Sequence, residues 1–216
     1  MTVAESSSIT SNTSEIVAEL IAGNNIVDAM IGIGIVKDSE AVYFEYVGDK
    51  ETIAITDPRS GKPVKKFGNV LLNGLSIAED VGEFKSTKLN IYLQTGQGRT
   101  LMLTSGLNTI WSQCVLTGLM EIWNQGKLDS LISIDTWKGN SKMKPCFAAV
   151  KIDEKKFSDT HMYEQLREAR SMKDSAKVMN ICRDAVELLN HAINNEPDSI
   201  LEVSLADATT TTNGDF

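Results

Sequence analysis

The spacing of apolar residues changes along the chain, and this change constrains the fold more than any other feature. Between Ile26 and Thr56, β-branched and aromatic residues form three short runs, separated by turn-forming residues; the runs span 26–36, 41–47 and 52–56. Such runs between turns are typical of strands. From Asp159 to Asn195, apolar residues recur with helical spacing instead. The pattern predicts an antiparallel meander first and a helical extension last.

Two hairpins are predicted between these regions. Leu89, Ile91 and Leu93 alternate with polar residues, and a Gly-Gln-Gly turn at 96–98 leads into a second strand at 100–104. A later pair of strands, 130–137 and 144–152, is joined by the polar segment 138–143. The segment 66–80 is ambiguous, and we interpret it as a strand and a loop.

Helices are predicted at three places. A short one follows Asn12 or Thr13 as its cap and ends at Gly23. A second, capped by Asn108 and ended by Gly126, turns Ile110, Val115, Leu119 and Ile122 inward and places Trp111 and Trp123 in the core.

The helical extension carries an apolar stripe and is split into two helices near 171–175, a polar segment. The stripe contains Met162, Leu166, Ala169, Met172, Ala176, Met179, Val186, Leu189 and Ile193. Its methionines either dock on the sheet or another subunit, or line a groove for a partner.

These elements together predict a mainly β protein with helical additions. Several antiparallel strands with one helix inserted before the last two match the OB-fold, a small Greek-key barrel, although a sandwich or another barrel stays open. We therefore expect an N-terminal segment with a short helix (1–24), an OB-like domain (25–157), a helical extension (158–196) and an acidic, disordered tail (197–216).

Charge is distributed unevenly along the chain. The net charge is −6 over residues 1–48, +4 over 49–157 and −6 over 158–216, and no Lys or Arg follows Arg183. Eleven of the thirteen aromatic residues lie between Tyr43 and Phe157. The predicted sheet is thus both the basic and the aromatic part of the chain.

The sequence gives no support to several classes of protein. The sequence contains neither an apolar run long enough to span a membrane nor a secretory or transit signal at its start, which leads us to expect a cytoplasmic protein. Three cysteines without a C-x-x-C pair and two distant histidines argue against disulfides and zinc. We expect no metal, no cofactor and no enzymatic activity, since no catalytic motif is present; Gly32 and Gly34 fit a curved strand better than a nucleotide-binding loop.

The residues of the central region are better suited to binding single-stranded nucleic acid. Such a ligand needs cations for its phosphates and aromatic faces on which its bases stack. The sequence supplies both in the second hairpin, with further cations beside the other strands: Lys62, Lys65, Lys66, Lys88, Tyr92, Arg99, Trp137, Lys138, Lys142, Lys144 and Phe147. Trp137 is the most informative, because it lies at a strand end beside a basic turn. Exposed lysines and aromatic strands are also common in proteins that bind no nucleic acid.

The chain ends in a threonine-rich segment followed by Asn213, Gly214, Asp215 and Phe216. A basic, aromatic sheet followed by an acidic tail that ends in Phe resembles the single-stranded-DNA-binding proteins of bacteria and bacteriophages. The resemblance implies an OB-fold core and a tail that recruits replication or repair enzymes and competes with DNA. By this resemblance, Asp215 and Phe216 are the partner-binding residues. The tail here is richer in threonine, and its linker shorter, than the resemblance implies.

We therefore expect a protein that coats single-stranded DNA during replication, recombination or repair, with a tail that binds other proteins and with a possible homo-oligomer. The alternative is an assembly module in which the sheet and helices bind proteins and the lysines only solvate the surface. An enzyme subunit with an unrecognised site is a third, weaker possibility.

Overall fold

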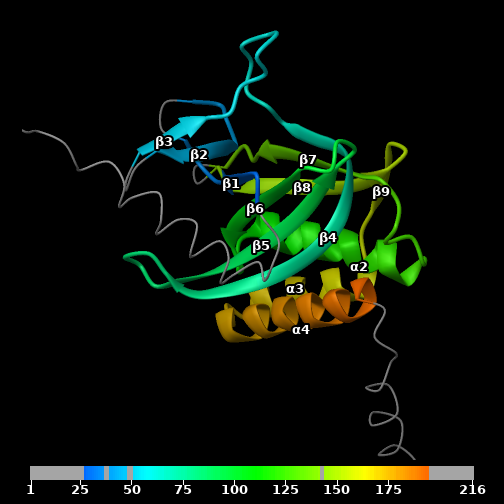
Figure 1. Cartoon of the computed structure of the whole chain (residues 1–216). Coiled ribbons are helices and arrows are strands. Elements are labelled where there is room, and N and C mark those ends of the chain that lie inside the picture. The colour runs from blue at the N-terminus through cyan, green and yellow to red at the C-terminus, as the bar shows by residue number, and fades with distance from the viewer. Residues whose placement is uncertain (1–26, 37–38, 48–50, 142–143, 195–216) are drawn as a thin grey trace, which may run out of the picture.

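The computed structural model describes residues 27–36, 39–47, 51–141 and 144–194 (Figure 1). The predicted helix at 12–23, Lys142, and the tail with Asp215 and Phe216 lie outside the described residues. Nine strands form one sheet in the order β3-β2-β1-β6-β5-β4-β7-β8-β9. The strands are β1 (Ala29–Ile33), β2 (Tyr43–Val47), β3 (Glu51–Ala54), β4 (Lys66–Val81), β5 (Ser86–Thr95), β6 (Thr100–Gly106), β7 (Ile132–Lys138), β8 (Cys146–Ile152) and β9 (Lys155–Phe157).

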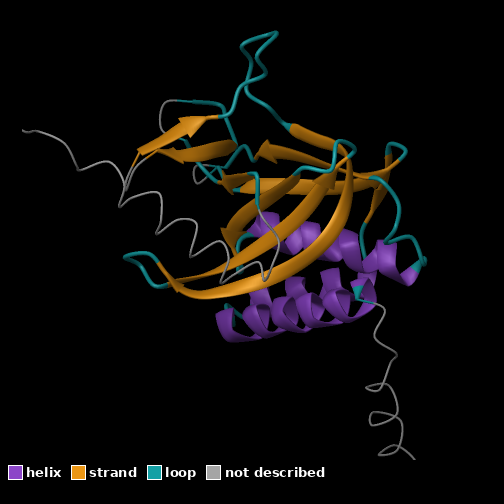
Figure 2. Ribbon diagram, in the orientation of Figure 1, coloured by secondary structure: helices purple, strands orange, loops and turns teal. Residues whose placement is uncertain are grey.

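Three helices lie together on one side of this sheet, below it in the view of Figure 2. They are α2 (Ile110–Asn124), α3 (Thr160–Ser171) and α4 (Ser175–Ile193). The predicted break between the last two is confirmed at Met172–Asp174. The predicted cap of α2 is wrong by one residue, because the side chain of Thr109, not Asn108, accepts from the Ser112 amide.

The mainly β architecture is confirmed, but the predicted closed, antiparallel barrel is not. The ladder is open, and β1 pairs with β6 in parallel, so the sheet is mixed. The sheet nevertheless curls strongly. An isolated bridge between Thr56 and Pro63 brings the segment after β3 to the segment before β4.

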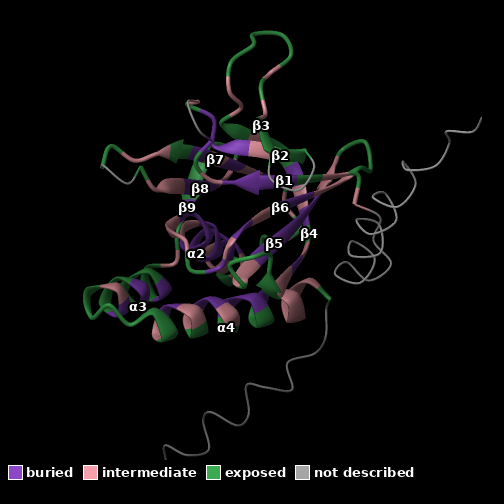
Figure 3. Cartoon of the chain, turned by 90° about the vertical axis from the view of Figure 1, so that its left-hand side faces the viewer, coloured by how far each residue is buried: buried purple, intermediate pink, exposed green. Residues whose placement is uncertain are grey.

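The core lies on the inner side of this curl, where the inward residues of the sheet meet α2 (Figure 3). Trp111 and Val115 on α2 are buried there, as predicted from helical spacing, while Trp123 is half-buried. Gly118 allows α2 to approach β8, since a Cβ at this position would lie 2.7 Å from Val150 Cγ2. One continuous core thus joins the sheet to its helices.

The helical extension packs into the same core through Met162, Leu166, Cys182 and Leu189. Met179 is half-buried, but Met172 and Ala176 from the predicted stripe are exposed. The buried side of the extension therefore packs against its own chain, which agrees with the docking interpretation of the stripe.

Candidate nucleic-acid interface

The two aromatic residues of the second hairpin form a stacked pair on the outer side of the sheet. Strand alternation turns Ile132, Ile134 and Thr136 inward, so Trp137 must point outward. Phe147 is its partner across the β7–β8 ladder. The ring centroids are 6.1 Å apart with 16° between the planes, and Trp137 is 42% exposed. The pair thus offers a flat aromatic surface to the solvent.

The hairpin turn supports this pair. A Cβ at Gly139 would lie 2.7 Å from Phe147 Cε2, so only glycine allows the ring to lie this close to the turn. Two lysines fasten the hairpin to the connection between β1 and β2. Lys138 Nζ donates to the Ser39 carbonyl at 2.6 Å, and Lys144 Nζ lies 3.9 Å from Glu40 Oε1. The ammonium group of Lys138 is therefore occupied by a hydrogen bond within the fold, whereas the side chain of Lys144 is exposed to solvent.

The cluster Lys62, Lys65 and Lys66 lies beside this hairpin. The Lys65 carbonyl accepts from the Thr136 amide at 2.7 Å, which places Lys65 one residue from Trp137 along the ladder. Lys66 pairs with Glu154 at 2.6 Å, and this partner lowers the pKa of the Glu154 carboxyl. Within the described ranges, Lys62 and Lys65 are exposed and form no ion pair. Both can reach an incoming phosphate without releasing an acid.

The loop that carries Lys62 has a defined shape and projects at the top of Figure 1. Asp57 organises it: its side chain accepts from the Arg59 amide at 2.9 Å and from the Ser60 hydroxyl at 2.9 Å. The bond from the Arg59 amide is the main cause of the lowered pKa of Asp57. Residues 57–66 line a shallow depression of about 470 Å³.

The remaining predicted residues do not join this cluster. Lys88 and Tyr92 lie on β5, two strands from β7, and Arg99 lies in the β5–β6 turn, 3.9 Å from Asp28. Tyr92 is buried, and its hydroxyl bonds to Ser76 at 3.1 Å. Burial also raises the pKa of Tyr92. Its ring is not open to a stacking base, in contrast to what the sequence predicts.

Charged residues on the outer face of β8 and β9 were missed by the sequence analysis. Lys151 Nζ bonds to Asp135 Oδ2 at 2.6 Å, and this bond is the main cause of the raised pKa of Lys151. Lys156 faces Lys151 across the ladder. The alternation of Phe147, Ala149 and Lys151 along β8 is the signal that could have found this face.

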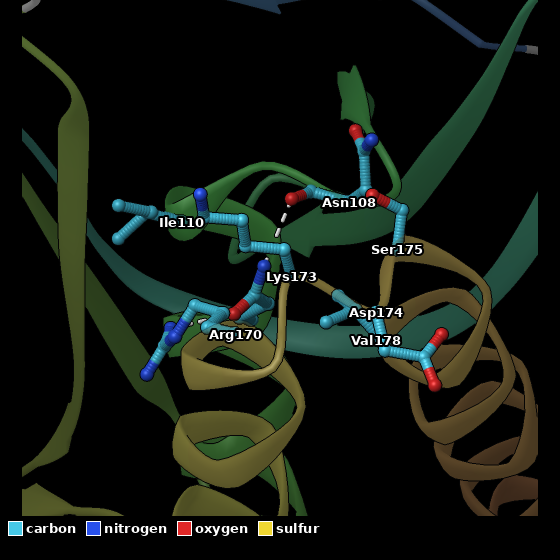
Figure 4. A pocket seen from close by; sticks show the side chains of 8 residues that line it. Asn108, Ile110, Arg170, Lys173, Asp174, Ser175 and Val178 are labelled. Atoms are coloured by element: carbon cyan, nitrogen blue, oxygen red, sulfur yellow. Dashed lines mark hydrogen bonds between the residues drawn. The ribbon is translucent and has the colours of Figure 1, made fainter.

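A second depression, of about 240 Å³, lies where α2, α3 and α4 meet (Figure 4). Arg170 donates to Gln113 Oε1 at 2.6 Å, and Gln113 in turn donates to the Asn108 carbonyl at 2.8 Å. The Asp174 side chain accepts from the Lys177 amide as the cap of α4. These polar groups already form hydrogen bonds that join or cap the helices. We therefore interpret the depression as a feature of helix packing.

The cysteines behave as buried or half-buried thiols in the described residues, and all three are free. Burial raises the pKa of Cys182 to about 12 and also raises the pKa of Cys146. Over the same part of the chain, His, Cys, Asp and Glu form no group that could hold a metal ion, and the helices are too short or too polar to cross a membrane.

Comparison of the chain with protein-family models, with curated proteins and with solved structures finds no match.

Proposed function

We propose that this chain binds single-stranded DNA, without strong dependence on sequence and without cleaving it. The observation that carries the proposal is the outward, half-exposed Trp137–Phe147 pair. The exposed Lys65 lies opposite Thr136, the residue before Trp137. Aromatic faces next to cations are what a single strand requires, since bases stack on the rings and phosphates are neutralised by the lysines.

The proposal includes an OB-like core within residues 25–157. In the chain order of this region, one helix, α2, precedes the hairpin of β7 and β8. In OB-folds, connecting loops of this kind contact oligonucleotides. The partner-recruiting role of Asp215 and Phe216 belongs to the same proposal and rests on the resemblance alone.

The test uses a labelled oligo-dT and fluorescence anisotropy at about 50 mM salt, where phosphate contacts are strongest. We expect the Trp137→Ala variant to bind about 10- to 100-fold more weakly, because each stacked base contributes roughly 1–3 kcal/mol. Lys65→Gln should weaken binding and reduce the salt dependence by about one ion. Arg167→Gln on α3 removes one exposed charge elsewhere, and it should bind like the wild type.

Lack of binding by the wild-type chain at this salt concentration would overturn the proposal. So would equal affinities of the Trp137→Ala, Lys65→Gln and Arg167→Gln variants. Quenching of tryptophan fluorescence by unlabelled oligo-dT gives a second readout. Trp111 is buried and bonded to Thr136, and Trp123 is half-buried, so Trp137 is the most exposed of the three tryptophans. The Trp137→Ala variant measures how much of the quenching comes from Trp137.

An assembly module that binds proteins is the second candidate, and it too is supported by an observation. Phe84, in the turn between β4 and β5, is 91% exposed, and Ile53 is exposed on the edge strand β3. Phe84→Ser and Ile53→Ser should then lower the mass measured by sedimentation, whereas the DNA-binding proposal expects oligonucleotide affinity to be unchanged by Phe84→Ser.

A further inference from the structure

A second pair of aromatic side chains lies on the outer side of β2. Tyr43 points inward, where its hydroxyl bonds to Thr136 and its ring contacts Phe67 at 4.6 Å between centroids. Alternation therefore turns Phe44 and Tyr46 outward. Their centroids are 5.2 Å apart with 83° between the planes, and Tyr46 is 46% exposed.

Gly32 on β1 and Gly34, just after β1, lie under the Phe44 ring of this pair. Gly32 is the ladder partner of Phe44, and a Cβ on Gly32 would lie 2.3 Å from Phe44 Cε2. A Cβ on Gly34 would lie 3.4 Å from Phe44 Cε1. The ring therefore lies directly against the backbone of β1, in space that a side chain at position 32 would fill. This contact holds Phe44 in position and explains why residue 32 is a glycine.

The face around Phe44 and Tyr46 is free of acidic partners in the adjoining ladder. The residues opposite them on β3 are Ala54 and Thr52. Glu45 is in register with Ile53, and Glu51 is in register with Val47. These positions alternate with those of Phe44 and Tyr46, so the two glutamates belong to the opposite face of the strands. A phosphate chain crossing the aromatic pair would not meet the carboxylates of these two strands.

Backbone hydrogen bonds connect this surface to the Trp137 surface around the outside of the curl. The Ile55 amide donates to the Tyr43 carbonyl at 3.0 Å, and the Val64 amide donates to the Ile55 carbonyl at 3.0 Å. The Thr136 amide then donates to the Lys65 carbonyl at 2.7 Å. Two extended segments thus separate β2 from β7, which corresponds to about 14 Å at roughly 4.8 Å per strand.

We infer that Phe44 and Tyr46 form a second base-stacking site for single-stranded DNA, and that one strand runs from Trp137 and Phe147 past Lys65 to this pair. This inference rests on the proposed function. It extends the interface from one hairpin to the outer surface of β2, on the far side of the segment that carries Lys65. Tyr46 is the more exposed of the two residues, so it should make the larger contact with DNA.

The experiment compares affinities for oligo-dT of increasing length, from about 4 to about 16 nucleotides, a range that covers known OB-fold site sizes. We expect wild-type affinity to rise until both aromatic pairs are occupied. Tyr46→Ala should stop this rise at a shorter length and weaken binding of the longest oligonucleotide about 10-fold or more. Trp137→Ala should weaken binding at every length.

Tyr163→Ala is the matched control, because Tyr163 on α3 has the same exposed fraction as Tyr46, 46%, but lies on a helix. It should bind every oligonucleotide like the wild type. As a measurement on the wild-type chain, oligo-dT carrying 5-iododeoxyuridine is photo-crosslinked and the adducts are located by mass spectrometry. We expect adducts on Tyr46 or Phe44 as well as on Trp137.

The outcomes separate the two proposals. If Trp137→Ala impairs binding while Tyr46→Ala matches the wild type at all lengths and no adduct forms on β2, the second site is wrong and the proposed function stands. If the wild-type chain binds no oligonucleotide of any length, both are overturned.

Discussion

The Thr136 hydroxyl joins three elements that no ladder connects. Trp111 Nε1 on α2 donates to Thr136 Oγ1 at 2.9 Å, and the Tyr43 hydroxyl on β2 lies 2.5 Å from the same oxygen. All three residues are buried. Because buried polar groups need partners, this one hydroxyl helps to hold the curl of the sheet around α2.

Replacing Thr136 by Val should therefore destabilise the protein although the shape of the side chain is kept. The indole N–H and the phenol hydroxyl would both lose their partner, and each such group costs about 1–3 kcal/mol. We expect the free energy of unfolding in urea to fall by about 2 kcal/mol or more. Thr136→Ser keeps the hydroxyl and is the control. Equal stabilities of the two variants would contradict this role.

At the same scale, ion pairs decide which predicted lysines remain available. Lys66 and Glu154 are 88 positions apart in the chain, and the sequence offers no sign that they meet. Lys65, next to Lys66, is exposed and unpaired within the described ranges. Lys65 and Lys66 look equivalent in the sequence, but they differ in how readily they can contact a phosphate, because only Lys66 is paired with a carboxylate.

At the level of elements, β4 shows why its segment was ambiguous. Its ladders contain register shifts between Phe67 and Val70, between Leu72 and Gly74, and between Ala78 and Val81. Each shift changes which residues face inward, so the sequence lacks the regular alternation of a strand. The observed element is a continuous strand of 16 residues that pairs with both β5 and β7.

Next to the shift between Leu72 and Gly74, α4 is hydrogen-bonded to β4. Asn190 on α4 accepts from the Leu75 amide at 3.0 Å and donates to the Leu75 carbonyl at 2.8 Å. Asn190→Ala should lower the free energy of unfolding by about 1–3 kcal/mol, because two backbone groups lose their partner. Asn180→Ala, at an exposed position of α4, should have little effect in the same denaturation experiment. A loss of equal size in both variants would show that the bonds to Leu75 do not matter.

For the whole molecule, burial of protonated groups predicts sensitivity to alkaline pH. The pKa values of Tyr43, Cys146 and Cys182 are all raised, mainly by burial. In the unfolded chain these groups ionise near pH 9 for cysteine and pH 10 for tyrosine. The folded chain keeps its protons longer, so rising pH favours the unfolded state.

We therefore expect the free energy of unfolding to be fully retained below about pH 9 and to fall as the pH rises towards 12, where the folded Cys182 thiol also ionises. Urea denaturation at a series of pH values measures this. Cys182→Ala should reduce the decline that begins near pH 9, to which Cys146 also contributes. A free energy that stays constant up to pH 11 would contradict the prediction.

Most elements other than β4 and β9 can be predicted from the sequence, because local spacing and turn residues decide them. The β1–β2–β3 meander, both hairpins, α2 with its buried Trp111 and the break between α3 and α4 all follow from patterns within about 20 residues. Trp137 was also singled out from local sequence, because it lies at a strand end beside a basic turn. These features need no knowledge of distant parts of the chain.

How the elements meet cannot be predicted from local patterns, because it depends on contacts between residues far apart in the chain. The end strands β3 and β9 do not pair with each other, so the sheet is open, and β1 pairs with β6 in parallel, where the sequence predicted a closed antiparallel barrel. The burial of Tyr92 against Ser76 removed it from the expected interface. The contact between Gly32 and the Phe44 ring joins two strands, so the need for glycine at position 32 arises only when β2 pairs with β1.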